Sequence, residues 1–338
     1  MKNNHNTIPY SILELASVAE GSSPEQTFKN CLDLARNAEE YGYYRYWLAE
    51  HHNMISIASS ATAVLISHIA GGTKKIRVGS GGIMLPNHSP LIVAEQFGTL
   101  GSIYPNRIDL GLGRAPGTDQ VTAQAIRPDR MHAVGKFPEE IIQIQQYFSK
   151  ENQKSKVRAS VAEGVEVPIY ILGSSTDSAH LAAKTGLPYA FASHFAPPLL
   201  FEALAIYRKN FKPSEFLNEP YTIACVNVIA GDTNDEAEKI STTMIQMIYG
   251  VLTGNMDYMQ EPIEMTPYLR AISRDPAFQR MLKYAFVGDK ETVKQSVSTF
   301  LKDTEVNEIM VASHIFSHED RLNSYKIFAE IMKDLNNN

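Results

Sequence analysis

Short strand-like runs alternate with longer helix-like runs along nearly the whole chain, and this alternation restricts the fold more than any other feature. Eight runs are short and rich in β-branched or aromatic residues, and an amphipathic stretch follows each of them. Such alternation is typical of βα units, in which helices join parallel strands. It therefore predicts an α/β fold, the (β/α)8 or TIM barrel. The strands are expected at residues 10–18, 44–49, 76–85, 107–114, 168–172, 189–192, 222–230 and 308–312.

A doubly wound open sheet is the competing arrangement for strands that alternate with helices. It needs a glycine-rich phosphate-binding turn after its first strand. Here the first strand ends in residues 16–21, Ala-Ser-Val-Ala-Glu-Gly, which lack that turn. The barrel is therefore preferred, as a single domain over residues 1–338. Its helices are expected at 24–40, 59–70, 90–103, 138–149, 178–185, 198–210, 234–248, 290–301 and 318–335.

Residues 250–285 interrupt the alternation before the last strand. They hold several methionines, tyrosines and prolines without a steady period. Two interpretations stay open: an insertion of short helices packed on the barrel, or a lid over a pocket, because long insertions in compact domains are often functional. Residues 115–131, between the fourth strand and the next helix, are expected to form a polar loop.

Composition narrows the class of protein. The chain of 338 residues is 44% hydrophobic, so it can bury a large core, and its net charge of -6 comes without a basic run, which argues against nucleic acid as a partner. No signal-like segment opens the chain, and no run reaches the roughly 18 apolar residues of a membrane helix. A cytoplasmic protein is expected. Cys31 and Cys225 lie in apolar contexts and are expected to be reduced core residues.

Two neighbouring strands end in glycine. The third carries Ser80, Gly81 and Gly82, and the fourth ends in Gly113 followed by Arg114. Glycine allows close approach of a ligand to the backbone because it has no Cβ. In a barrel the chemistry sits at the carboxyl ends of the strands. The pair therefore predicts a ligand lying against the backbone with a cationic group beside it.

Two more strand ends contribute candidates. The second strand leads into Glu50, His51 and His52, and a histidine there can act as an acid or base near neutral pH. The fifth strand leads through residues 173–178, Gly-Ser-Ser-Thr-Asp-Ser, into a helix, where free amides and hydroxyls suit a phosphate. Plainer interpretations remain open: N-capping for the serines, an ion pair for Arg114, and a hydrogen-bonded rim position for the histidines.

Two other patterns in the sequence do not meet the requirements of the sites they resemble. Residues 111–117 resemble a dinucleotide-binding loop, but the third glycine comes one residue late and Pro116 interrupts the turn. The adjacent His51 and His52 would point to opposite sides of a strand, so they make a poor chelating pair, and no metal site is expected.

The surviving motifs resemble the bacterial luciferase-like flavin monooxygenases, in the branch of single-chain enzymes of unassigned substrate. The resemblance covers nearly the whole chain in order. It rests on Trp47-x-x-Glu-His-His52, Val78-Gly-Ser-Gly-Gly-Ile-Met-Leu-Pro86, Arg107-x-Asp-Leu-Gly-x-Gly-Arg114, Ile169-Tyr-Ile-Leu-Gly-Ser-Ser-x-x-Ser178 and Phe286-Val-Gly-Asp-Lys-Glu-Thr-Val.

The resemblance implies a barrel, often dimeric, that binds FMN at the strand ends. It implies a cis peptide between Gly81 and Gly82 beneath the flavin ring. It also implies that Arg114 binds the phosphate and that His51 is the acid or base beside the flavin. We expect Glu50, the residue before it, to orient His51. The cofactor-binding set expected from it is Ser80, Gly81, Gly82, Arg114, Ser174, Ser175 and Ser178.

The function this implies is oxygenation of a small organic substrate with reduced FMN and O2, with a separate reductase supplying the flavin and a homodimer as the assembly. The absence of a nicotinamide-binding fingerprint favours that two-component arrangement. Two alternatives stay open: a deazaflavin-dependent hydride-transfer enzyme, and a flavin-binding protein without catalysis. Gly113 and Ser174 stand where luciferase itself has a cysteine and a glutamate, so neither light emission nor aldehyde specificity follows.

Overall fold

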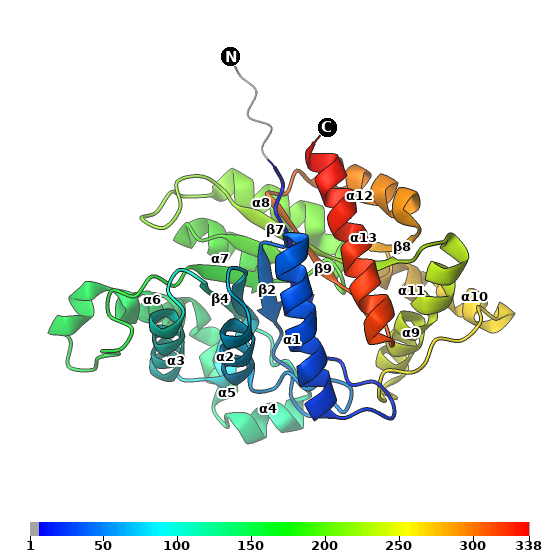
Figure 1. The fold of residues 1–338 in the computed structure, drawn as a ribbon. Coiled ribbons are helices and arrows are strands. Elements are labelled where there is room, and N and C mark those ends of the chain that lie inside the picture. Colours follow the sequence, from blue (N-terminus) through cyan, green and yellow to red (C-terminus); the bar gives the residue numbers. More distant parts are fainter. Residues whose placement is uncertain (1–6, 338) are drawn as a thin grey trace, which may run out of the picture.

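Eight parallel strands close into a barrel in the computed structural model, which describes residues 7–337. The strands follow the order β6-β5-β4-β3-β2-β1-β9-β7, and pairing of β6 with β7 closes the ring. Figure 1 shows the helices arranged around these strands. The predicted (β/α)8 barrel is thereby confirmed. Its strands are β1 Tyr10–Glu14, β2 Arg45–Leu48, β3 Arg77–Met84, β4 Ile108–Gly113, β5 Ile169–Gly173, β6 Tyr189–Phe191, β7 Thr222–Ala230 and β9 Glu308–Ala312.

A ninth strand, β8 (Ala285–Gly288), was not among the predicted elements. It pairs in parallel with the second half of β7, from Asn227 to Ala230. The three-residue β6 pairs only as far as Ala224 of the nine-residue β7. Strand β8 therefore takes up the backbone groups of β7 that β6 is too short to reach.

Helices surround the barrel close to their predicted positions. The larger ones are α1 Pro24–Tyr41, α2 Thr62–Gly72, α3 Pro90–Ile103, α6 Phe137–Phe148, α7 Thr176–Thr185, α8 Leu200–Asn210, α9 Asn234–Thr253, α12 Lys290–Thr304 and α13 His318–Asn336. Helix α1 shows why the boundaries agree: the Ser23 side chain accepts from the Gln26 amide, and Gly42 ends the helix in the left-handed conformation.

Two boundaries differ from prediction. Strand β1 stops at Glu14 instead of residue 18, because Ala16 has a positive φ of 52° and leaves the extended conformation. The expected polar loop after β4 contains two short helices, α4 (Gln120–Ile126) and α5 (Arg130–Gly135). Short polar helices of this kind carry little apolar periodicity by which a sequence could reveal them.

The segment 250–285 also contains short helices. Helix α9 continues to Thr253, and α10 (Pro267–Ser273) and α11 (Pro276–Met281) follow. Three 3-10 turns complete the chain: η1 Leu85–Asn87, η2 Lys150–Lys154 and η3 Pro197–Leu199.

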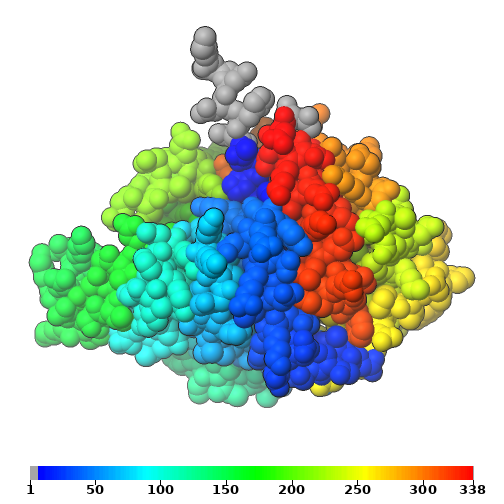
Figure 2. Space-filling view, in the orientation of Figure 1, coloured from blue at the N-terminus to red at the C-terminus, as the bar shows by residue number. Residues whose placement is uncertain are grey.

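The ends of the barrel differ. In Figure 1, α4 and α5 lie at one end, whereas α13 finishes at the other. Figure 2 shows the same side as a continuous surface, on which α1 and α13 run side by side and cover the strands.

No helix within residues 7–337 has the length and apolar character needed to cross a membrane. Both cysteines, Cys31 and Cys225, are free and buried, as predicted.

A buried network of charged side chains lies inside the barrel. Arg45 on β2 donates from Nη1 to Asp109 Oδ2 and from Nε to Glu308 Oε1, each over 2.8 Å. Its Nη1 also donates to the Tyr170 hydroxyl, and Trp47 Nε1 donates to the same oxygen of Asp109 over 3.0 Å. The three charged side chains are at most 2% exposed. The network therefore joins β2, β4, β5 and β9 across the barrel.

We predict that Arg45→Met destabilises the protein by roughly 3–5 kcal/mol, because it removes the counter-ion of the buried Glu308 and leaves the buried Asp109 paired with Arg77 alone. The measurement is the free energy of unfolding from urea denaturation. Lys29→Met is the matched control, since it breaks an exposed pair with Glu25 on α1 and should change stability far less. Equal small effects of both substitutions would contradict a structural role for the network.

Candidate active site

One cavity of about 1170 Å³ opens at the carboxyl ends of the strands. Its wall includes residues from the ends of β2, β3, β4, β5 and β6, and much of the segment after α9. This is the end of the barrel at which the sequence predicted the site. The predicted site residues on its wall are Glu50, His51, Gly81, Arg114, Ser174, Ser175 and Ser178.

Glu50 is a buried node of hydrogen bonds just after β2. Its carboxylate accepts from His52 Nε2 and His88 Nε2 over 2.9 Å, and from the Met84 amide over 3.0 Å. Burial would raise the pKa of Glu50, but these donors outweigh it and lower the pKa to about 2.

The described residues contain no group of three or more histidine, cysteine or acidic side chains placed to hold a metal ion.

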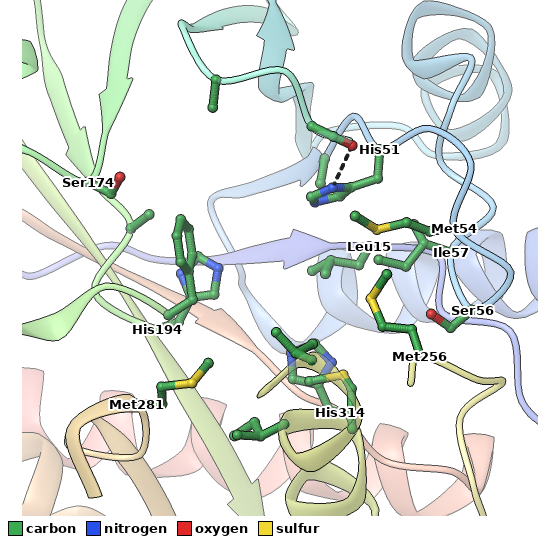
Figure 3. A pocket seen from close by; sticks show the side chains of 18 of the residues that line it. Leu15, His51, Met54, Ser56, Ile57, Ser174, His194, Met256, Met281 and His314 are labelled. Atoms are coloured by element: carbon green, nitrogen blue, oxygen red, sulfur yellow. Dashed lines mark hydrogen bonds between the residues drawn. The ribbon is translucent and has the colours of Figure 1, made fainter. Parts of the chain in front are cut away.

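His51 stands beside this node but does not share its hydrogen bonds. Its Nδ1 lies 3.3 Å from the carbonyl oxygen of Gly117, a contact drawn in Figure 3. The same carbonyl accepts from the His52 amide over 3.1 Å. Burial lowers the pKa of His51, so the ring is neutral near pH 7. Glu50, which we expected to orient His51, makes its histidine hydrogen bonds to His52 and His88.

Gly117 makes the contact to His51 possible. Its φ is +66°, a conformation that other residues rarely adopt. A Cβ there would also lie 2.5 Å from the Glu50 carbonyl oxygen. The loop after β4 can therefore lie directly on the segment after β2 only with glycine at this position.

The glycine pair of β3 has the backbone geometry that the resemblance implies. The peptide bond between Gly81 and Gly82 is cis. A Cβ on Gly81 would come within 2.7 Å of Leu13 Cδ1, and one on Gly82 within 2.2 Å of Leu172 Cδ1. At Gly82 the Cβ would also lie 2.7 Å from the Gly111 carbonyl oxygen, so the backbone of β4 excludes a larger residue there, whereas at Gly81 the Leu13 side chain would have to move. Gly81 lines the cavity, whereas Gly82 is not among its lining residues.

Ser80 does not fit its predicted place beside a ligand. The side chain is fully buried and is not part of the cavity wall. Its hydroxyl donates to the Gly111 carbonyl and accepts from the Gly111 amide, each over 2.9 Å. The pairing of β3 with β4 shifts register between Ser80 and Ile83, and Ser80 bridges the two strands at that irregularity.

Arg114, Asp177 and Ser178 form a polar corner where β4 and β5 end. Arg114 Nη2 lies 3.2 Å from Asp177 Oδ2, with side chains 47% and 70% exposed. The Ser178 hydroxyl donates to the Ser175 carbonyl over 2.7 Å and lies 3.0 Å from the Tyr189 hydroxyl. Ser175 is the N-cap of α7 but makes no side-chain cap hydrogen bond. The capping interpretation therefore does not account for the Ser175 hydroxyl.

Arg130 of α5 was not predicted from the sequence, although it also lines the cavity. Its Nε donates to Asn87 Oδ1 and its Nη2 to the Arg114 carbonyl, each over 2.9 Å. Asn87 in turn donates to the Pro116 carbonyl over 2.9 Å. These hydrogen bonds hold the segment after β4 against the turn that follows β3.

The opposite end of the cavity is apolar and rich in methionine. Eight of the twelve methionines line the cavity, and Met54, Met256 and Met281 are labelled in Figure 3. Unbranched thioether side chains adapt to ligands of different shape. The segment 250–285 supplies part of this wall and is tied to residues 18–20, where the Met259 amide donates to the Val18 carbonyl over 2.9 Å.

Two further histidines, His194 and His314, face the same cavity and were missed in the sequence. They follow β6 and β9, and Figure 3 shows their rings converging with that of His51 from different sides. Burial lowers the pKa of His194 to about 3 and that of His314 to about 4. One signal could have found them, because Ala-Ser-His occurs at the end of both strands, at residues 192–194 and 312–314.

Comparison with known proteins identifies relatives over almost the full length. Residues 9–308 match the family model for luciferase-like monooxygenases. The chain is 49% identical to the uncharacterized protein YvbT of Bacillus subtilis (strain 168), over 96% of each chain. It is 46% identical to a luciferase-like monooxygenase of Escherichia coli (strain K12), over 97% of this chain and 98% of the other. It is also 30% identical to N-acetyl-S-alkylcysteine monooxygenase of Bacillus subtilis (strain 168), over 96% and 98%.

Solved structures share the fold. That of apo-MsnO8 is 32% identical with a TM-score of 0.88, over 96% of this chain and 98% of that one. The oxygenating constituent of 3,6-diketocamphane monooxygenase from Pseudomonas putida, solved with FMN, has a TM-score of 0.73 at 17% identity, over 96% and 97%. An F420-dependent secondary alcohol dehydrogenase has a TM-score of 0.70 at 15% identity, over 96% and 98%.

We predict that Glu50→Gln lowers stability in a pH-dependent way. A carboxyl whose pKa falls from roughly 4.3 to about 2 on folding stabilises the protein fully above pH 4.3, and this contribution is lost as pH falls toward 2. Glu50→Gln should therefore cost on the order of 1–3 kcal/mol at pH 7 and progressively less toward pH 2.5. Urea denaturation at several pH values measures this difference. A cost that stays constant over the acid range would show that the Glu50 charge does not stabilise the fold.

Proposed function

The chain belongs to the luciferase-like monooxygenase family, and from that premise we propose that it uses reduced FMN and O2 to oxygenate a small organic substrate. The observation that carries the proposal is the composition of the single cavity at the barrel mouth. A cationic, hydroxyl-rich corner, a neutral histidine and an adaptable apolar wall follow one another around it. These suit, in turn, a phosphate, a proton transfer and an organic substrate.

The polar corner fits the flavin phosphate. Arg114 would hold it, together with Ser174, Ser175 and Ser178 at the start of α7. The Arg114 guanidinium is half exposed, and its ion-pair partner Asp177 is an exposed side chain. A doubly charged phosphate can therefore take the place of the Asp177 carboxylate at little cost in free energy. Gly81 would lie beside the ring, where the backbone forms the cavity wall. Bound FMN in its reduced form would supply the electrons with which O2 is activated.

His51 is the proposed acid or base. Its ring is neutral near pH 7, and the hydrogen bond to the Gly117 carbonyl places the proton on Nδ1. Nε2 is then free to accept a proton. Glu50 acts on His51 indirectly. It binds the side chains of His52 and His88, and thereby fixes the backbone next to His51.

The segment 250–285 is the proposed lid of the cavity. It joins the wall with Met256, Tyr258 and Met259 and carries several exposed apolar side chains. A lid of this kind excludes water during the reaction. Elsewhere on the surface, Val64 in α2 and Ile92 in α3 are exposed, as the surface of a homodimer would require. A separate reductase is the proposed source of reduced flavin.

The direct test compares cofactors and then follows oxygen. The purified protein is titrated with FMN, reduced FMN and a reduced deazaflavin under argon, and the preferred complex is mixed with ¹⁸O₂ in the presence of candidate substrates. The proposal predicts binding of reduced FMN and one ¹⁸O atom in the product. Tight binding of deazaflavin without an oxygen reaction would establish the hydride-transfer alternative. FMN binding with no change in its reaction with O2 would indicate a flavin carrier.

Arg114→Ala should weaken FMN binding by roughly 10- to 100-fold, the size of a lost charge-assisted hydrogen bond, and leave riboflavin binding unchanged. Riboflavin is the matched ligand because it lacks only the phosphate. Asp177→Asn should have the opposite effect and tighten FMN binding, since it frees the guanidinium. Flavin fluorescence quenching measures both dissociation constants. Equal losses for FMN and riboflavin would place the phosphate elsewhere.

His51→Gln should slow the oxidation of bound reduced FMN by O2 without changing FMN affinity. Burial lowers the pKa of His51 below the ordinary histidine value of about 6.5. The neutral imidazole, which can accept a proton, is therefore the main form at pH 7, and it becomes protonated only at pH values below about 6.5. The wild-type rate should therefore decline on the acid side, and this decline should vanish in His51→Gln. Stopped-flow absorbance between pH 5 and 8 measures it. An identical pH profile in the variant would exclude His51 from the proton transfer.

A further inference from the structure

Two matching segments attach to β7 from opposite sides. Ser193 donates to the Cys225 carbonyl over 2.6 Å, and Ser313 donates to the Val228 carbonyl over 2.5 Å. Each serine is the middle residue of an Ala-Ser-His sequence, and the strands that precede them, β6 and β9, both pair with β7. The two serines thereby place His194 and His314 on the cavity wall on either side of β7.

Asn227 of β7 lies between these anchoring points and is 3% exposed. Its Nδ2 donates to the His194 carbonyl over 2.7 Å, which leaves Oδ1 as the free acceptor of a residue that lines the cavity. Oδ1 is buried and has no hydrogen-bond partner within the described part of the chain. A buried polar atom without a partner costs roughly 1–3 kcal/mol, so such an atom on a cavity wall calls for an explanation.

The two histidines also carry ring nitrogens without a hydrogen-bond partner. His194 Nδ1 is buried and has no partner within the described part of the chain. The ring of His314, which is 5% exposed, takes part in none of the hydrogen bonds found within residues 7–337. Burial keeps both rings neutral, so each offers one donor and one acceptor. Asn227, His194 and His314 together form a cluster of neutral hydrogen-bonding groups, which we call the β7 polar cluster.

The surroundings of the β7 polar cluster are apolar. Met244, Ile248 and Met281 contribute to the same cavity. The arginines of the cavity wall, Arg114 and Arg130, belong to the β4 side and are engaged there with Asp177 and Asn87. Arg321, whose charge acts on His314, is already paired with the buried Glu14 over 2.8 Å. A carboxylate bound at the cluster would thus be desolvated without a cationic partner of its own, which is costly. A neutral group that both donates and accepts would satisfy the free atoms.

We propose that the β7 polar cluster recognises a neutral hydroxyl or amide group of the substrate, whose apolar body lies against the methionine-rich wall. The proposal rests on the proposed function, because it names the substrate class of the same cavity. The Asn227 carbonyl oxygen accepts from the hydroxyl or amide N–H, and an imidazole donates to its oxygen. The polar corner around Arg114 remains free for the flavin phosphate.

Four probes built on a six-carbon chain test the proposal: hexan-1-ol, hexanamide, hexanoate and hexyl methyl ether. Calorimetry measures their binding to the protein with and without FMN. The alcohol and the amide should bind at least roughly tenfold more tightly than hexanoate, which lacks a cationic partner, and than the ether, which cannot donate. Equal binding of all four, or no binding of the alcohol and the amide, would overturn the proposal.

Variants locate the recognition. Asn227→Leu and His194→Phe keep side-chain volume and remove the free polar atoms, so each should abolish the preference for the alcohol and the amide. Two variants are used because Asn227 also binds the His194 carbonyl and its replacement can affect folding, whereas the His194 ring makes no such hydrogen bond. Met281→Leu, on the apolar wall, is the control and should keep the preference. A preference that survives both polar substitutions contradicts the proposal.

The two proposals fail separately. If the protein does not bind FMN but the apoprotein still prefers the alcohol and the amide, the proposed function is wrong and the recognition site stands. If FMN binds and is oxidised as expected but the probes show no preference, the β7 polar cluster does not recognise this class of substrate.

Discussion

The ion pairs of Arg45 inside the barrel are the constraint on which the rest of the structure depends. A guanidinium that is 2% exposed binds Asp109 and Glu308, which come from β4 and β9. The pairs require β2, β4 and β9 to keep one register, because a shift by one residue would turn a charge outward and leave its partner buried alone. The relative heights of the strand ends follow from that register, and the site is built from those ends.

At the mouth of the barrel, Glu50 is a second buried charge that holds several elements together. Its carboxylate accepts hydrogen bonds from the segment after β2 and from the end of β3, and Arg130 connects the turn after β3 to the segment after β4. Loops held in this way position the neutral His51 imidazole against the Gly117 carbonyl, with no direct hydrogen bond to Glu50. The positions of His51, Arg114 and Gly117 relative to one another are therefore a property of this network, and the more exposed ion pair of Arg114 can open without disturbing it.

The fold could be predicted because local signals agreed with the tertiary arrangement. Ser23 and Gly42 mark the ends of α1 in the sequence and in the structure. Strand β8 could not be foreseen, since four residues after an irregular segment become a strand only because the second half of β7 lacks a partner. The end of β1 was misplaced because the positive φ of Ala16 leaves no mark in an apolar alternation.

The site could be predicted only in part. Glycines and a lone arginine at strand ends indicated the cavity wall at Gly81 and Arg114 correctly. Ser80 was misplaced because its hydroxyl is taken up by hydrogen bonds to Gly111 of β4, beside a register irregularity that a sequence does not reveal. His194 and His314 are single histidines after short strands, and their meaning depends on serine hydrogen bonds to a strand far away in sequence.

A crystal structure of the complex with FMN tests the central claim most directly, that strand ends held by these buried networks form a flavin site with a separate substrate region. The account predicts the phosphate in hydrogen-bonding contact with Arg114 and the serines that begin α7, the ring beside Gly81 and His51, and the β7 polar cluster left free of the flavin. A phosphate outside the Arg114 corner, or a flavin ring hydrogen-bonded to Asn227 and His194, would contradict it.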